Sequence, residues 1–150
     1  MSELHGCGGV GRRYRMWART LNSWGYAALW SIASGHGALA TICNHGELLP
    51  PAVRARDAFN GANYLRSLPF VDPLRIGVIG FSHGGSTVLK AVLPETTSQA
   101  SAKPFHVAVA FYPDCEPPRS MLVTDTMTGR RSIAASAGAI GLKQMDTRYT

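Results

Sequence analysis

One short segment, Gly80-Phe-Ser-His-Gly84, constrains the fold more than any other part of the 150-residue chain. It follows an apolar run at 75–80 that predicts a buried strand, and it precedes a helical pattern at 84–93. A turn this tight between a strand and a helix crowds the positions two residues either side of Ser82, so both must be small. The two glycines meet that requirement. The segment therefore predicts a strand–turn–helix unit of the kind that builds α/β folds.

A first amphipathic helix is expected near the N-terminus. Tyr14, Trp17, Leu21 and Trp24 recur at three- and four-residue spacing, and Gly25 can close the helix. The arginines of this segment are expected on its solvated face. A nucleic-acid binder would concentrate its charge on one face. Here the net charge of +6 is divided between this helix and the C-terminal part, so no nucleic-acid partner is expected.

Helical and strand patterns alternate along the rest of the chain. A second helix is expected at 51–67, with Val53, Ala58, Ala62 and Leu65 facing inward, and its first residue is a proline that suits a first turn. Further strands are expected at 26–30 and 105–111, with loops at 31–49 and 94–104. This alternation predicts the α/β class, in which helices cover both faces of a parallel sheet and the crossovers are right-handed.

The composition agrees with a folded domain. Hydrophobic residues make up 45% and charged residues 16%, which excludes a disordered chain. No apolar run is long enough to span a membrane, and no signal peptide is visible, so a cytoplasmic location is expected by default. Cys7, Cys43 and Cys115 fit no zinc pattern and are not expected to form a disulfide framework. No metal or cofactor is expected.

Ser82 is the candidate nucleophile. In a G-x-S-x-G turn between strand and helix, the serine Oγ projects above the carboxyl edge of the sheet, where α/β folds bind ligands. The new helix would direct the amide of His83 at a developing oxyanion. The glycine-rich segment 5–9 could supply a second donor, the amide of Cys7. An ordinary turn is the alternative interpretation of each segment.

The order of short motifs along residues 4 to 118 resembles the dienelactone hydrolase family of α/β-hydrolases. The motifs are His5-Gly-Cys-Gly-Gly9, Tyr14-Arg-Met-Trp17, Trp24-Gly-Tyr26, Leu49-Pro-Pro51, Arg56-Asp57-Ala58, Val71-Asp-Pro73, Arg75-Ile-Gly77, Gly80-Phe-Ser-His-Gly-Gly85 and Ala110-Phe-Tyr-Pro113. The resemblance implies a partial α/β-hydrolase fold that cleaves a small-molecule carboxylic ester or lactone through an acyl-Ser82 intermediate. The family's namesake enzymes carry a cysteine at the position of Ser82. In having a serine there, the chain resembles the family's carboxylesterase-like relatives.

A serine hydrolase also needs a base and a carboxylate that orients it. In this fold they follow the serine, with the acid before the histidine. After Ser82 the chain contains only His83, inside the turn, and His106, at the start of an expected strand. Asp125 follows a possible strand at 121–123 and is a candidate for the acid. With no expected base, we predict impaired activity. The alternative is a non-catalytic pseudoenzyme or a truncated fragment that acts, if at all, as an interaction module.

The segment 119–150 differs from the residues before it. It shows no clear periodicity, and 124–131 stands where the resembled family has Asp-Asp-Trp-Thr. Some synonymous codons for these residues encode His-Asp-Asp-Trp-Thr-Pro in another reading frame. We therefore divide the chain into an incomplete α/β-hydrolase core at 1–118 and a frameshifted or disordered tail. Only Met1–Leu4 precede the glycine-rich segment, so both edges of the sheet are expected to be missing.

Overall fold

The computed structural model describes residues 1–32, 41–114 and the backbone of 132–136. Its strands are β1 (Ser2–Leu4), β2 (Leu29–Ser31), β3 (Gly77–Phe81), β4 (Val107–Phe111) and β5 (Ser132–Ser136). Its helices are α1 (Arg12–Ser23), the 3-10 turn η1 (Gly46–Leu48), α2 (Pro51–Ser67), α3 (His83–Ala91) and α4 (Pro94–Gln99). Within these residues no helix is long and apolar enough to cross a membrane.

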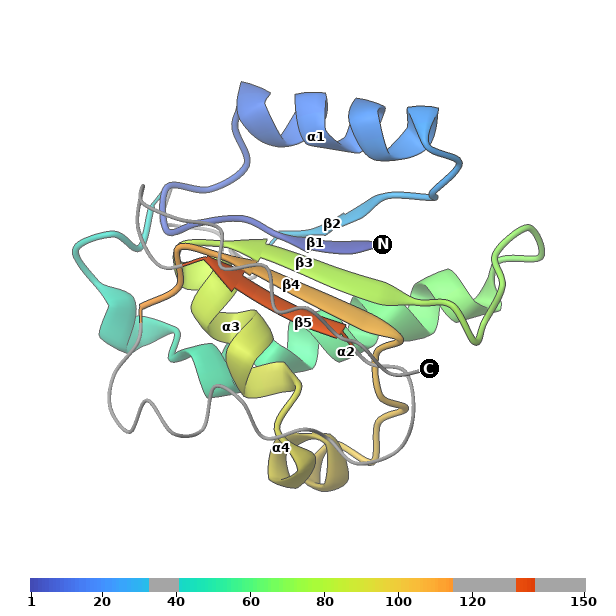
Figure 1. The fold of residues 1–150 in the computed structure, drawn as a ribbon. Coiled ribbons are helices and arrows are strands. Elements are labelled where there is room, and N and C mark those ends of the chain that lie inside the picture. The colour runs from blue at the N-terminus through green and yellow to red at the C-terminus, as the bar shows by residue number, and fades with distance from the viewer. Residues whose placement is uncertain (33–40, 115–131, 137–150) are drawn as a thin grey trace.

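The strands form one parallel sheet in the order β2-β1-β3-β4-β5. Helix α1 covers one face, and α2 and α3 cover the other (Figure 1). This arrangement confirms the predicted α/β class. The chain adds β2 on one side of β1 and then crosses to place β3 on the other. The direction of winding therefore reverses between β1 and β3, and the carboxyl ends of these two strands form a topological switch point.

Two strands lie where the sequence predicted none. The few residues before the glycine-rich segment form β1, which pairs with β2 and β3 and is buried throughout. A three-residue strand is too short to show a hydrophobic period. Strand β5 lies inside the segment predicted as an atypical tail, and it pairs with β4 over five residues. The remainder of that segment, residues 119–131 and 137–150, lies outside the described residues, so its frameshift or disorder stays a prediction.

Helix α2 has its predicted bounds but turns a different face toward the core. Ala58, Ala62 and Leu65 are buried as predicted, whereas the Val53 side chain is 52% exposed and Arg54 has no exposed surface. Successive helical residues are rotated by about 100°, so Arg54 shares a face with Ala58 and Leu65 while Val53 does not. The prediction for Val53 was wrong because it followed residue type and overlooked spacing. The core between α2, α3 and the sheet includes Leu4, Phe59, Ile76, Val78, Val88 and Ala110.

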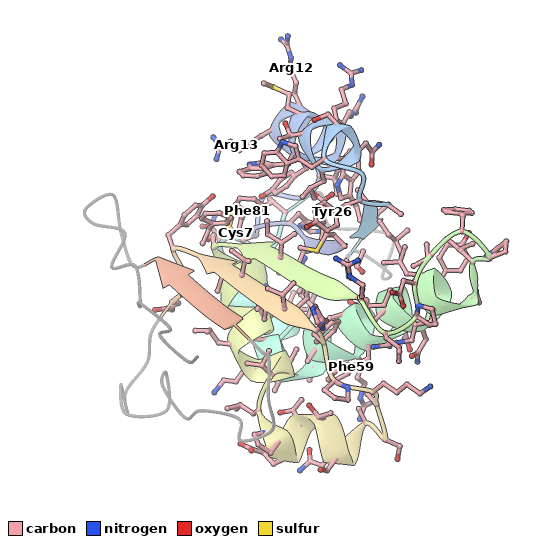
Figure 2. The ribbon with its side chains drawn as sticks, turned by 45° about the vertical axis from the view of Figure 1, so that its right-hand side comes forward. Cys7, Arg12, Arg13, Tyr26, Phe59 and Phe81 are labelled. Atoms are coloured by element: carbon pink, nitrogen blue, oxygen red, sulfur yellow. A yellow bond between two sulfur atoms is a disulfide. The ribbon has the colours of Figure 1, made fainter. Side chains whose placement is uncertain are left out.

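The opposite face of the sheet is packed against α1 through aromatic rings. The Trp17 ring lies 5.6 Å from that of Phe81 and 5.7 Å from that of Phe111, centroid to centroid. Trp24 is 63% exposed, contrary to the predicted stripe, because the helix ends one residue before it. Gly25 follows with a φ of 84°, as expected of a residue that closes a helix. The arginines at the start of α1 are exposed as predicted, and Figure 2 shows Arg12 and Arg13 pointing away from the sheet.

A buried carboxylate lies beneath α1. Glu3 is 1% exposed, and its two neighbours in strand register are Trp30 and Ile79. Neither Glu3 oxygen has a hydrogen-bond partner in the described part of the chain. Removal from water raises the pKa of Glu3 to about 7, and the Trp30 indole and the amino terminus oppose this rise to a smaller extent. The charged form of Glu3 therefore destabilises the fold.

Replacement of this side chain, Glu3→Gln, is expected to stabilise the fold in a pH-dependent manner. Below the ordinary pKa of 4.5 the carboxyl is protonated whether the chain is folded or not. As pH rises from 4.5 to about 7, the unfolded state ionises while the folded state resists, so stability falls; above about pH 7 the full penalty applies. The difference between these two pKa values of Glu3 corresponds to about 3 kcal/mol, which is an upper value for the gain in unfolding free energy at high pH. Urea unfolding at about pH 8 and about pH 4 measures it.

Glu95→Gln is the matched control, because Glu95 is exposed on α4. It should change stability by less than about 0.5 kcal/mol at either pH. An equal effect of Glu3→Gln at both pH values would show that the Glu3 carboxylate carries no burial penalty.

Candidate active site

The two segments singled out by sequence meet at the switch point. The strand–helix turn, residues 80–84, leaves the carboxyl end of β3, and the glycine-rich loop, residues 5–9, leaves the carboxyl end of β1. A Cβ built on Gly6 would lie 3.4 Å from the Ser82 Cβ, so the loop passes directly beside the serine. Ligands of open α/β sheets bind at this position.

Ser82 adopts a backbone conformation that a side chain rarely tolerates. Its φ is 52° and its ψ is −122°. Such a conformation costs on the order of 1–3 kcal/mol and persists only where its surroundings hold it. Here the Ser82 amide donates to the Phe111 carbonyl at 2.9 Å, and the Ser82 carbonyl accepts from the Ser86 amide at 2.9 Å. Ser82 thus forms the turn between β3 and α3, and its side chain is half-buried there.

The glycines on either side of Ser82 are required sterically. A Cβ on Gly80 would collide with the carbonyl of Gly84 and lie 2.8 Å from Val88 Cγ2. A Cβ on Gly84 would collide with the Leu4 carbonyl oxygen and lie 2.7 Å from that of His5. The predicted need for small residues is confirmed, and the structure adds a second cause. Gly84 must be small because β1 and the loop after it pass against it.

Cys7 is held from two directions. Its sulfur is bonded to Cys43, with 4.7 Å between the two Cα atoms. Its carbonyl accepts from the Ile42 amide at 2.9 Å and from the Thr41 hydroxyl at 3.2 Å. The cysteines were expected to form no disulfide framework, and this single bond was not predicted, because a separation of 36 residues gives no sign that the switch point brings the two cysteines together. Cys115 lies outside the described residues.

Fully buried Arg54 and half-buried His83 form a polar cluster beneath the turn, which sequence reasoning missed. Arg54 Nη1 donates to the His5 carbonyl at 2.7 Å and lies 2.9 Å from His83 Nδ1. His83 Nε2 lies 3.0 Å from the Leu49 carbonyl oxygen. Burial, followed by the charge of Arg54, lowers the pKa of His83. Helical spacing from Ala58 was the one available signal for Arg54, and a charged residue at an inward position is easily read as exposed.

The described hydrogen bonds of His106, His45 and Asp114 are made to residues other than Ser82. His106 immediately precedes β4, and its amide donates to the Ile76 carbonyl, so it lies at the amino edge of the sheet. The opposite edge is about 17 Å away at 3.3 Å per residue. Exposed His45 contacts Glu47 at 3.3 Å between Nδ1 and Oε1. The Asp114 amide donates to Ser86 Oγ at 2.8 Å, and its side chain is exposed. The predicted acid Asp125, and His36, lie outside the described residues.

A parallel sheet of this order, with a strained serine turn after its central strand and a loop from β1 beside it, has the architecture of an α/β-hydrolase in partial form. The chain belongs to the prolyl oligopeptidase family, whose model matches residues 13–137. No curated protein matches it. The earlier resemblance to dienelactone hydrolases is thus confirmed for the α/β-hydrolase superfamily, and the narrower family remains a prediction.

Among solved structures the chain is similar to one titled m3DLH, with a TM-score of 0.63 and 24% identity. The match covers 92% of this chain and 56% of that one. The chain therefore spans little more than half the length of that structure, and the likeness concerns the fold.

Proposed function

We propose that the chain carries the nucleophile of a serine hydrolase that cleaves a carboxylic ester or lactone. The strained backbone of Ser82 at the switch point is the observation that carries this proposal. Ser82 Oγ forms a bond to the carbonyl carbon, and the ester C–O bond then breaks to release the alcohol, which takes up a proton. Water hydrolyses the resulting acyl-Ser82 and restores the hydroxyl.

The oxyanion formed in each step needs hydrogen-bond donors. The His83 amide belongs to the first turn of α3, where backbone amides have no partner within the helix. We assign the second donor to the Cys7 amide in the glycine-rich loop, which the disulfide and the Ile42 bond hold beside the turn. Two such donors stabilise the negative oxygen without proton transfer.

Proton transfer is the step for which this chain is poorly equipped. The hydrogen bonds of the His83 and His45 rings go to groups other than the Ser82 hydroxyl, and the 150-residue sequence has no histidine after His106. With no histidine described beside the Ser82 hydroxyl, we propose that this hydroxyl loses its proton to solvent. Serine-protease precedents retain roughly 10³-fold catalysis over water from the oxyanion hole and binding alone. We therefore propose low activity, with a non-catalytic interaction module as the alternative.

The same reasoning favours an ester over a peptide, although the matching family is named for oligopeptidases. An amine leaves a tetrahedral intermediate only when a general acid protonates it, and that acid is the histidine that also serves as base. A phenol or alcohol with a low pKa leaves without that help. The relative rates on a p-nitrophenyl ester and on a peptide anilide distinguish the two substrate classes.

Ser82→Ala is expected to abolish the protein's turnover of p-nitrophenyl acetate above the buffer rate. The missing hydroxyl is the proposed attacking atom, whereas Ser98→Ala, on the exposed surface of α4, should leave the rate unchanged. The release of p-nitrophenol by the purified chain measures this. An equal rate for the Ser82→Ala variant and the unaltered chain would refute the proposed nucleophile. The absence of turnover in a stably folded chain would favour the non-catalytic alternative.

A further inference from the structure

Arg54 is buried although it carries a charge, and its position on α2 alone does not account for the cost of burying that charge. Its side chain is fully buried in the first turns of α2. A guanidinium is expensive to remove from water, and a buried one is normally retained with several partners. Arg54 Nε and Nη2 have no hydrogen-bond partner within the described ranges, so its bonding is concentrated at Nη1. Burial lowers the pKa of Arg54 to about 10, which still leaves it charged, and Asp57 opposes that change.

The bonds of Nη1 determine the protonation of His83. A guanidinium can only donate, so His83 Nδ1, 2.9 Å away, must accept. The ring proton must then sit on Nε2, where it donates to the Leu49 carbonyl at 3.0 Å. His83 is therefore neutral and held in a single tautomer. The charged or titratable groups that face it are Arg54 and His5.

We propose that Arg54 is a positioning residue that joins the two donor segments of the candidate site. One nitrogen, Nη1, holds the His5 carbonyl of the glycine-rich loop and the His83 imidazole of the strand–helix turn. The Cys7 and His83 amides are thereby fixed relative to each other. From the α1 side, the Tyr14 hydroxyl holds the same loop by accepting from the Gly6 amide at 2.7 Å. Arg54 makes the corresponding link from the α2 side.

The tautomer of His83 tests this link directly. Long-range ¹H–¹⁵N spectra of the folded chain should show His83 protonated on Nε2 alone near neutral pH. In Arg54→Met the Nδ1 acceptor loses its donor, so His83 should show mixed tautomers and take up its second proton at a higher pH. Arg56→Met is the matched control, because Arg56 lies on the exposed side of the same helix. It should leave the His83 signals unchanged.

Two results would overturn the link. The first is a His83 that carries its proton on Nδ1, or two protons, in the unaltered chain near neutral pH; this result needs no variant to fold. The second is a folded Arg54→Met variant whose His83 signals match those of the unaltered chain.

The catalytic consequence rests on the proposed function and has a separate readout. Misplaced donors should lower kcat for p-nitrophenyl acetate in Arg54→Met by roughly 10- to 100-fold, with KM little changed. An unchanged kcat in folded Arg54→Met would overturn the positioning role. If the unaltered chain has no Ser82-dependent turnover, the proposed function fails, while the His83 spectra still decide whether Arg54 holds the turn.

Discussion

Gly84→Ala should destabilise the protein by about 3 kcal/mol or more, which is a large part of the stability of a typical domain. The added Cβ would meet the backbone of β1 and the His5 carbonyl, not the flexible end of a side chain. Relief would require β1 to move away from α3, although β1 pairs with a strand on each side. Urea unfolding followed by circular dichroism measures the change.

Gly8→Ala provides the comparison, because a Cβ at Gly8 meets no atom within 4 Å. We expect it to lie within about 0.5 kcal/mol of the unaltered chain. A Gly84→Ala variant as stable as Gly8→Ala would mean that β1 does not pass against the strand–helix turn, and the geometry of the site would then be wrong.

Cys43→Ser should cost about 4 kcal/mol of stability. The Cys7–Cys43 bond joins residues 36 positions apart, and the loop that it closes includes α1 and β2. Opening it enlarges the conformational freedom of the unfolded chain, which disfavours folding. The substitution should also loosen the glycine-rich loop, because Cys7 then keeps only the bonds that its carbonyl accepts from the loop at 41–42.

A reducing agent provides the internal control for this prediction. It should lower the urea midpoint of the unaltered chain to that of Cys43→Ser and leave the variant itself unchanged. If neither the substitution nor the reductant moves the midpoint, the two cysteines are not bonded in solution. Because disulfides persist mainly in oxidising compartments, the redox state of this pair in cells also tests the expected cytoplasmic location.

The parts of the fold that were predictable are those fixed by local pattern. Helix α2 begins at a proline and has its predicted bounds, and the apolar runs gave β3 and β4 to within two residues. The strand–helix turn was predictable because its two glycines serve a local steric need. Strand β1 is too short to carry a period, and β5 lies in a segment without one.

The sequence predicted the site residues that belong to local motifs, but not those that reach the site from distant segments. Ser82 follows a predicted strand, so its place at the carboxyl edge of the sheet could be inferred from topology. The strand that brings the glycine-rich loop to the same edge, β1, was not predicted. Arg54 and Cys43 reach the same place from α2 and from the loop before it, and nothing in their own sequence surroundings indicates that. The contacts of Arg54 and Cys43 depend on the order of the strands in the sheet. That order places residues as distant in the sequence as His5 and His83 side by side, where Arg54 contacts both.

The role of Ser82 as nucleophile is tested most directly by trapping its acyl intermediate. Without a described base, deacylation should be slow, so incubation with p-nitrophenyl acetate should leave an acetyl group on the protein. Peptide mapping by mass spectrometry should place it on Ser82, and Ser82→Ala should lack it while Ser98→Ala retains it. Acetylation confined to lysines or the amino terminus, equal in both variants, would contradict the assignment of this site.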